Sequence, residues 1–205
     1  MHNAVPAVAH EQVLHSGDLG SPRLADVPLV IIDMQFVFGD PSSTACVPGY
    51  ASASVAVQRL LPVFEGRTIY TKFVAPDQPH GAWLAYYEQW PFLLRPNTDP
   101  IWDITKEFST HNADVVSKHT FSKWGPELAA ATLYGHELVL VGVSTDCCVL
   151  STALAAIDAG VRVRVVADAC AGVSHSSHQQ ALSIMAQYAP IIDVSTVEDI
   201  MSDAV

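Results

Sequence analysis

The sequence contains few basic residues: 10 Lys and Arg against 21 Asp and Glu give this 205-residue chain a formal net charge of −11. So few basic side chains cannot form a positively charged stripe that neutralises phosphates. This argues against a nucleic-acid-binding protein and against docking on anionic lipid. The chain also lacks an apolar run of the roughly 18 residues that cross a bilayer. Its first residues lack the basic-then-apolar order of a signal peptide, so we expect a cytoplasmic protein with no membrane partner.

The pattern of cysteines and the absence of a glycine-rich phosphate loop exclude further classes of protein. The four cysteines form no C-x-x-C pair and no regular framework, which predicts free thiols in a reducing compartment: they are Cys46, Cys147, Cys148 and Cys170. Neither G-x-G-x-x-G nor G-K-[ST] occurs, so we expect no dinucleotide or nucleoside triphosphate cofactor. Half of the residues are hydrophobic and 15% are charged, a composition that can bury a large core.

Hydrophobic patterning predicts one domain over residues 28–205, preceded by an extended polar arm over 1–27. Short β-branched runs bounded by turn residues occupy 28–33, 67–73, 113–119, 137–143, 161–168 and 190–195. Several of them are apolar on consecutive residues, as in strands that are covered on both faces. The stretches between the last four runs are rich in Ala, Leu and Gln, which favours helix. The sequence therefore predicts an α/β fold, a three-layer α/β/α sandwich around a six-stranded, mostly parallel sheet.

One aromatic segment interrupts this alternation. Residues 76–112 bring six large rings into a short stretch: Trp83, Tyr86, Tyr87, Trp90, Phe92 and Trp102. The segment could form a satellite core under a long excursion, or the wall of a ligand pocket, or both. An insertion after a strand of an α/β protein lies over the carboxyl ends of the sheet, where ligands bind.

Polar residues end two of the apolar strands at this same edge. Asp33 ends LVIID and Lys118 ends VVSK. Each has an ordinary interpretation, Asp33 as the cap of a following turn and Lys118 as a solvated strand end. Asp33 also suits a general base, because a carboxylate at the end of a buried strand is partly desolvated.

Two adjacent cysteines follow a third strand end. The run 137–143 leads into STDCCVLST, which opens a helix capped by one of residues 144–146. Cys148 would then lie in the first turn, where free N–H groups and the helix dipole lower a thiol pKa. We interpret Cys147 as a small buried hydrophobe. Cys148 is the candidate nucleophile, because the two polar strand ends lie at the same edge.

Three motifs connect these residues to a known family. DMQ at 33–35, KHTFSKW at 118–124 and GVSTDCCVLSTALAAIDAG at 142–160 resemble the isochorismatase-like cysteine hydrolases. This family includes nicotinamidases, N-carbamoylsarcosine amidohydrolases, ureidoacrylate and biuret hydrolases, and the isochorismatases. The resemblance covers about residues 28–200.

The resemblance implies a catalytic triad of Asp33, Lys118 and Cys148. It also implies an oxyanion hole formed by the backbone N–H groups of Ser144 and Cys148, next to a cis peptide bond between Val143 and Ser144. At the level of the fold it implies strand order 3-2-1-4-5-6 and a homo-oligomer, a dimer or a tetramer.

Two departures from the family pattern narrow the function. Nicotinamidases carry a D-W-H-type metal motif where this chain has Phe73 and Ala75, so we expect no metal and no nicotinamidase activity. The common D-M-Q-N-D-F is D-M-Q-F-V-F here, which puts Phe36 and Phe38 at the expected mouth of the site. Isochorismatases proper lack the cysteine, so Cys148 argues against vinyl-ether cleavage.

The sequence therefore predicts a cysteine hydrolase without cofactor that cleaves a C–N bond of a small carboxamide or ureido compound through a thioester. Hydrolysis of a cyclic amide or lactam on the same triad, and a catalytically silent binding or scaffold protein, are the alternatives. Expected substrate contacts come from Gln35, Phe36, Phe38, Trp83, Trp90 and Trp124. His175 and His178 are expected to start a helix rather than bind a metal, and His80 and His119 receive no role.

Overall fold

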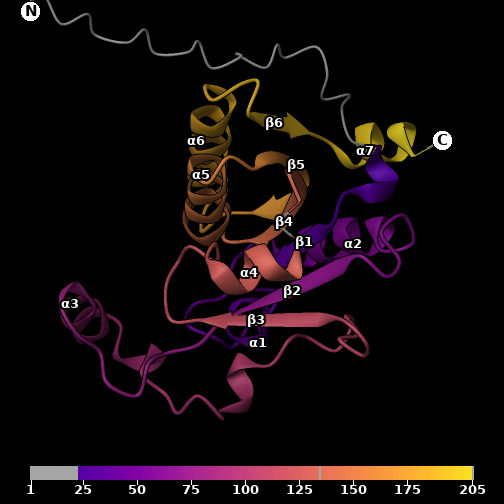
Figure 1. The fold of residues 1–205 in the computed structure, drawn as a ribbon. Helices are drawn as coiled ribbons and strands as arrows, with labels where there is room; N and C mark the ends of the chain where they lie inside the picture. Colours follow the sequence, from indigo (N-terminus) through magenta and orange to yellow (C-terminus); the bar gives the residue numbers. More distant parts are fainter. Residues whose placement is uncertain (1–22, 134, 205) are drawn as a thin grey trace, which may run out of the picture.

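The computed structural model describes residues 23–133 and 135–204, so residues 1–22 of the expected arm lie outside the described part (Figure 1). Its centre is a six-stranded, all-parallel sheet in the order β3-β2-β1-β4-β5-β6. The strands are β1 (Leu29–Ile32), β2 (Thr68–Phe73), β3 (Asp114–Lys118), β4 (Glu137–Val143), β5 (Arg162–Ala171) and β6 (Ile192–Ser195). The predicted α/β class and strand order are confirmed.

Seven α-helices are described: α1 (Phe36–Gly39), α2 (Tyr50–Leu60), α3 (Ala82–Gln89), α4 (Pro126–Ala131), α5 (Leu150–Asp158), α6 (His175–Ala186) and α7 (Val197–Asp203). Short 3-10 turns occupy Leu24–Asp26, Pro91–Leu93 and Pro100–Trp102. A π-helical turn, Thr145–Val149, joins β4 to α5. No helix of the described residues is long and apolar enough to span a membrane.

Different helices cover the two faces of the sheet, because successive side chains of a strand point to opposite faces. On β1, Leu29 and Ile31 pack in the layer that contains α2 and α7. Val30 and Ile32 pack in the layer that contains α4, α5 and α6 (Figure 1). All four of these side chains are fully buried, which explains the consecutive apolar residues of the run.

The predicted strand boundaries agree with the structure to within two residues at every end except one. Strand β5 continues to Ala171 rather than ending at 168, because its last residues still pair with β4. Helix α4 ends at Ala131, and Leu133, two residues further on, takes a left-handed φ of 53°. Gly160 follows α5 with a φ of 84°, as expected of a residue just beyond a helix end.

The aromatic segment forms a small core of its own beside the sheet. Tyr87, Leu93 and Trp102 from this segment cluster with Phe73 from β2 and with Val37 from α1. In Figure 1, α3 lies at the margin of the molecule beyond β2 and β3. The satellite-core interpretation is therefore correct, and the site described next shows that the pocket-wall interpretation is correct as well.

Candidate active site

The first polar group of the site, Asp33, lies directly after β1 in a buried turn. Its backbone takes a positive φ of 50°, and its side chain has no exposed surface. Thr71 on β2 fixes the carboxylate, because its hydroxyl donates to Asp33 Oδ1 at 2.7 Å. The neighbouring strand approaches closely at Gly142, where φ is 110° and a β-carbon would lie 2.2 Å from the Ile32 carbonyl oxygen. Glycine at this position therefore lets β4 reach the end of β1.

The lysine that pairs with Asp33 is Lys123, so the prediction that Lys118 fills this place is wrong. Lys123 Nζ lies 3.0 Å from Asp33 Oδ2, and both side chains are completely buried. Lys118 instead forms an ion pair of 3.0 Å with Glu127, whose side chain is 64% exposed. The physical reason is topological. Lys118 ends the edge strand β3, two strands away from β1, whereas the loop after β3 returns toward the centre of the sheet and carries Lys123 inward.

Lys123 is tied to the helix that carries the candidate nucleophile. Its backbone N–H donates to Thr152 Oγ1 at 2.9 Å, and the Thr152 hydroxyl donates to the Cys148 carbonyl oxygen at 2.7 Å. Its ammonium donates to the Thr120 carbonyl oxygen at 2.7 Å and lies 5.1 Å from the centre of the Phe73 ring. Lys123 is thus hydrogen-bonded through Thr152 to the turn that carries Cys148.

Cys148 lies in the π-helical turn and is 4% exposed. Hydrogen bonding with the adjacent thiol of Cys147, burial and the Asp33 carboxylate raise the pKa of Cys148 well above its ordinary value, while Lys123 acts in the opposite direction. The same contact between the thiols lowers the pKa of Cys147. The expected lowering of the Cys148 pKa by the helix end is wrong, because burial and the neighbouring groups prevail. All four cysteines are free thiols.

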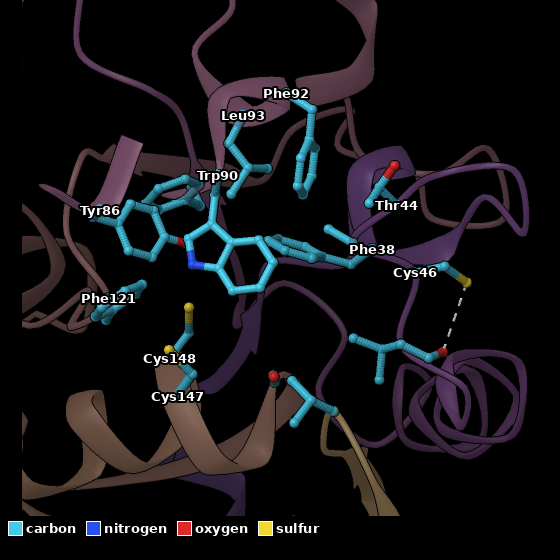
Figure 2. Close-up of a pocket in the computed structure, with 15 residues that line it drawn as sticks. Phe38, Thr44, Cys46, Tyr86, Trp90, Phe92, Leu93, Phe121, Cys147 and Cys148 are labelled. Atoms are coloured by element: carbon cyan, nitrogen blue, oxygen red, sulfur yellow. Dashed lines mark hydrogen bonds between the residues drawn. The ribbon is translucent and has the colours of Figure 1, made fainter. Parts of the chain in front are cut away.

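A cavity of about 350 Å³ opens above this thiol (Figure 2). Its lining is predominantly apolar and aromatic: Phe38, Thr44, Ala45, Cys46, Val47, Phe73, Tyr86, Trp90, Phe92, Leu93, Phe121, Ser144, Cys147, Cys148 and Val173. Figure 2 shows the Trp90 ring across the middle of the cavity, with Cys147 and Cys148 below it. The peptide bond between Val143 and Ser144, beside the two cysteines, is cis. The cavity therefore joins the aromatic segment to the candidate nucleophile.

Comparison with known proteins assigns the family. Residues 28–199 match the isochorismatase domain model. The chain belongs to the isochorismatase-like hydrolase family. A 38% identical relative, isochorismatase domain-containing protein 2 of Xenopus laevis, matches over 89 residues, 40% of this chain and 43% of that relative. The chain thus matches less than half the length of this curated relative.

Solved structures share the fold at low sequence identity. A cysteine hydrolase from Pseudomonas syringae pv. phaseolicola 1448A has a TM-score of 0.79 at 18% identity, covering 88% of this chain and 93% of that one. A nicotinamidase–pyrazinamidase from Acinetobacter baumanii has a TM-score of 0.70 at 21% identity, covering 88% and 100%. An N-carbamoylsarcosine amidase from Thermoplasma acidophilum has a TM-score of 0.67 at 18% identity, covering 83% and 96%. At these identities the similarity establishes the fold.

Within this family member, the expected substrate contacts divide into two groups. Phe38 and Trp90 line the cavity. Gln35 does not, because its buried side chain binds the backbone: its amide donates to the Phe73 and Trp102 carbonyl oxygens at 2.9 and 2.6 Å, and its oxygen accepts from the Phe73 N–H at 2.8 Å. Gln35 thus fixes β2 and the aromatic segment against the turn after β1.

The other three predicted contacts also lie outside the cavity lining. Phe36 is partly buried in α1 and is not among the lining residues. Trp83 stands behind the wall, with its ring centre 4.9 Å from that of Phe121. Trp124 packs with the core layer of α4, α5 and α6. These three rings lie outside the lining because the direction of a helix and the path of a loop decide which side chains face the cavity.

Several lining residues were missed by sequence reasoning. Tyr86 and Phe92 belong to the aromatic segment that the sequence did single out, and Phe121 lies inside the KHTFSKW motif beside the missed Lys123. The stretch 44–47, between α1 and α2, carries no motif or periodicity that would have indicated it.

Neither the positions that correspond to the nicotinamidase metal motif nor the histidines provide a set of metal ligands. Phe73 lines the cavity and Ala75 is buried in the aromatic cluster. In residues 23–133 and 135–204, no group of three or more His, Cys, Asp or Glu side chains could hold a metal ion. His119 Nδ1 lies 2.7 Å from the Val74 carbonyl oxygen. His178 Nδ1 lies 2.8 Å from the buried Thr145 hydroxyl, and burial lowers the pKa of this histidine.

Proposed function

We propose that this protein is a cysteine-dependent hydrolase that cleaves a C–N bond of a small carboxamide or ureido compound through a thioester. The observation that carries the proposal is a fully buried pair, Asp33 and Lys123, whose charges act on the buried Cys148 thiol. Asp33 Oδ2 lies 3.0 Å from the Lys123 ammonium and has no other polar partner among the described residues. A carboxylate oxygen has two lone pairs, so Oδ2 can accept a proton next to this ion pair. The electrostatic influence of Asp33 and Lys123 on the pKa of Cys148 indicates that both charges lie near the thiol.

A raised thiol pKa makes a base necessary, since the thiolate and not the thiol is the nucleophile. In the proposed reaction, Asp33 takes the Cys148 proton as the sulfur attacks the carbonyl carbon of the substrate. The Lys123 ammonium stabilises the negative charge that moves from the carboxylate to the sulfur and holds the carboxylate in place. This is the role that the sequence had assigned to Lys118.

The tetrahedral intermediate carries a negative oxygen that requires hydrogen-bond donors. We assign these donors to the backbone N–H groups of Ser144 and Cys148, two residues that line the cavity. The Ser144 N–H donates to no other described backbone group, which leaves it available. One such donor typically contributes about 3 kcal/mol to transition-state stabilisation.

Collapse of the intermediate expels the amine, and Asp33 returns the proton to this leaving group. The acyl group remains on Cys148 as a thioester. Asp33 then removes a proton from a water molecule that attacks the thioester. The C–S bond breaks, Asp33 returns this proton to the Cys148 sulfur, and the carboxylic acid leaves. The Asp33 carboxylate thus acts as base and acid in each half of the reaction, without a cofactor.

Amide hydrolysis measured on matched cysteine variants tests this proposal. Primary carboxamides and ureido compounds are screened for ammonia release, and lactams for ring opening. Cys148→Ala should abolish turnover, because the nucleophile is missing, whereas Cys147→Ala should keep most of it. If Cys147→Ala is inactive and Cys148→Ala is active, Cys147 is the nucleophile and the proposed assignment is wrong. A wild-type protein that hydrolyses none of these compounds, and whose Cys148 is not alkylated by iodoacetamide even at alkaline pH, would favour a silent scaffold.

A further inference from the structure

The cavity above Cys148 carries no ionisable group that could bind a charged substrate. Apart from the thiols and the Tyr86 phenol, its lining side chains are not titratable, and burial raises the pKa of Tyr86 further above its ordinary value. The other polar side-chain groups in the lining are the hydroxyl groups of Thr44 and Ser144 and the indole N–H of Trp90, none of which carries a charge. Six of the fifteen lining residues are aromatic: Phe38, Phe73, Tyr86, Trp90, Phe92 and Phe121.

Cations next to the lining segments are already neutralised. Lys72, Arg95 and Lys123, which lie within two residues of lining positions, are each paired with a carboxylate at 3.2, 3.2 and 3.0 Å. A substrate carboxylate in this cavity would lose its hydration without gaining a positive partner, and such an unpaired buried charge is strongly disfavoured. Amides that carry a second carboxylate should therefore bind poorly.

The size of the cavity favours substrates larger than a small ureido compound. An apolar protein cavity of about 150 Å³ holds one benzene molecule. The cavity here measures about 350 Å³, which is room for roughly two rings. A small ureido compound would leave much of this apolar surface without contacts. Figure 2 shows the Trp90 ring spanning the cavity, between Tyr86 and Phe121 on one side and Phe38 on the other, so that a flat group could pack against several rings.

We propose that the site takes an uncharged aryl or arylalkyl carboxamide, whose ring system fills the aromatic cavity while its carboxamide carbon faces Cys148. This inference rests on the proposed function and narrows it from carboxamides and ureido compounds in general to one class. It also assigns Trp90 and Phe92, the residues at the outer wall, to substrate selection rather than to the chemical steps.

Matched substrates test the assignment. The values of kcat/KM for ammonia release are compared for 2-naphthamide and 2-phenylacetamide, for 4-carbamoylbenzoate, which adds a carboxylate, and for N-carbamoylglycine, which is small and charged. We expect the uncharged aryl amides to be preferred by about 100-fold or more, as is typical when a buried charge lacks a partner. A preference for 4-carbamoylbenzoate or N-carbamoylglycine would overturn the inference.

Variants of the outer wall provide a second test. Trp90 is 41% exposed, so Trp90→Ala should fold and should raise KM for the aryl amides roughly tenfold with little change in kcat. Phe92→Arg supplies the missing cation and should improve kcat/KM for 4-carbamoylbenzoate while impairing 2-naphthamide. Leu84→Ala is the matched control, because Leu84 lies on α3, is 52% exposed and does not line the cavity. Unchanged KM values in Trp90→Ala would contradict the assignment.

Binding to the Cys148→Ala variant separates this inference from the proposed function. Quenching of tryptophan fluorescence by 2-naphthamide and by 4-carbamoylbenzoate reports occupancy without any chemistry. If 2-naphthamide binds selectively and the wild-type protein hydrolyses none of the amides, the proposed hydrolase function is refuted and the aromatic site is supported. Turnover of charged or ureido amides by the wild type, with no binding of 2-naphthamide, would support the hydrolase and refute the aromatic site.

Discussion

Replacing Lys123 by methionine should destabilise the protein far more than the same replacement of Lys118. Both Lys123 and Asp33 are fully buried at 3.0 Å, and removing one partner of such a pair costs about 3–5 kcal/mol because the other charge stays buried alone. The partner of Lys118, Glu127, is 64% exposed, and pairs of this kind contribute about 0–1 kcal/mol. Urea unfolding followed by fluorescence measures both free energies of unfolding.

The same two variants also separate the catalytic assignments. Lys123→Met should lose at least about 100-fold in kcat below its unfolding transition, since charge transfer from Asp33 to sulfur is no longer stabilised. Lys118→Met should stay within a few-fold of the wild type. An inactive Lys118→Met beside an active and stable Lys123→Met would refute the pairing and restore the lysine that the sequence motif suggested.

A double-mutant cycle determines how strongly the two charges are coupled. Asp33→Asn leaves the ammonium of Lys123 without its counter-charge, and Lys123→Met leaves the carboxylate. The double variant removes both charges and should therefore be more stable than the sum of the two single losses predicts, by roughly 0.5–3 kcal/mol. Additive losses would show that the two groups do not interact, contrary to their distance.

Three further predictions concern the backbone, the pH dependence and metal removal. Gly142→Ala should cost well over 1 kcal/mol in urea unfolding, because a β-carbon there would lie 2.2 Å from a carbonyl oxygen of β1, whereas Gly160→Ala, with open space around it, should cost only about 1 kcal/mol. Burial raises the pKa of Cys170 to about 12, so this thiol stabilises the fold fully below its unfolded pKa of about 8.5, and the contribution falls as the pH rises toward 12. Cys170→Ala should flatten this part of the pH profile, and an unchanged slope would contradict the assignment. Activity should survive dialysis against EDTA, because Phe73 and Ala75 cannot ligate a cation, and a loss restored by zinc or manganese would reveal a site built by other residues.

The sheet and the place of Cys148 after its fourth strand could be predicted from the sequence because both are local signals. Runs such as LVII are apolar on consecutive residues only where a strand is covered on both faces, and the structure buries all of β1. Asp33 follows β1 directly and Cys148 lies in the turn that follows β4, so their strands determine their positions at the carboxyl edge. The direction of the Cys148 pKa shift could not be predicted from local sequence, since it depends on burial and on groups contributed by other segments.

The lysine that pairs with Asp33 could not be predicted, because its position depends on the path of a loop. Lys118 and Lys123 are five residues apart in KHTFSKW, and residue type does not distinguish them. The distinction arises in three dimensions, where a backbone hydrogen bond from Lys123 to Thr152 on α5 draws the second lysine inward. Resemblance to the family favoured the strand end, whereas the fold of this chain buries the loop residue.

The structure also separates the groups proposed for chemistry from those proposed for substrate choice. Asp33, Lys123 and Cys148 are anchored to the central strands and to α5, where a shift of the backbone would disturb the core. Most of the cavity wall comes instead from the α1–α2 connection and from the segment that contains α3, which pack as a separate cluster beside the sheet. Substitutions in this outer wall leave the buried charge pair untouched. Substrate preference can therefore change through residues such as Trp90 and Phe92 while the proposed hydrolytic chemistry at Cys148 stays the same.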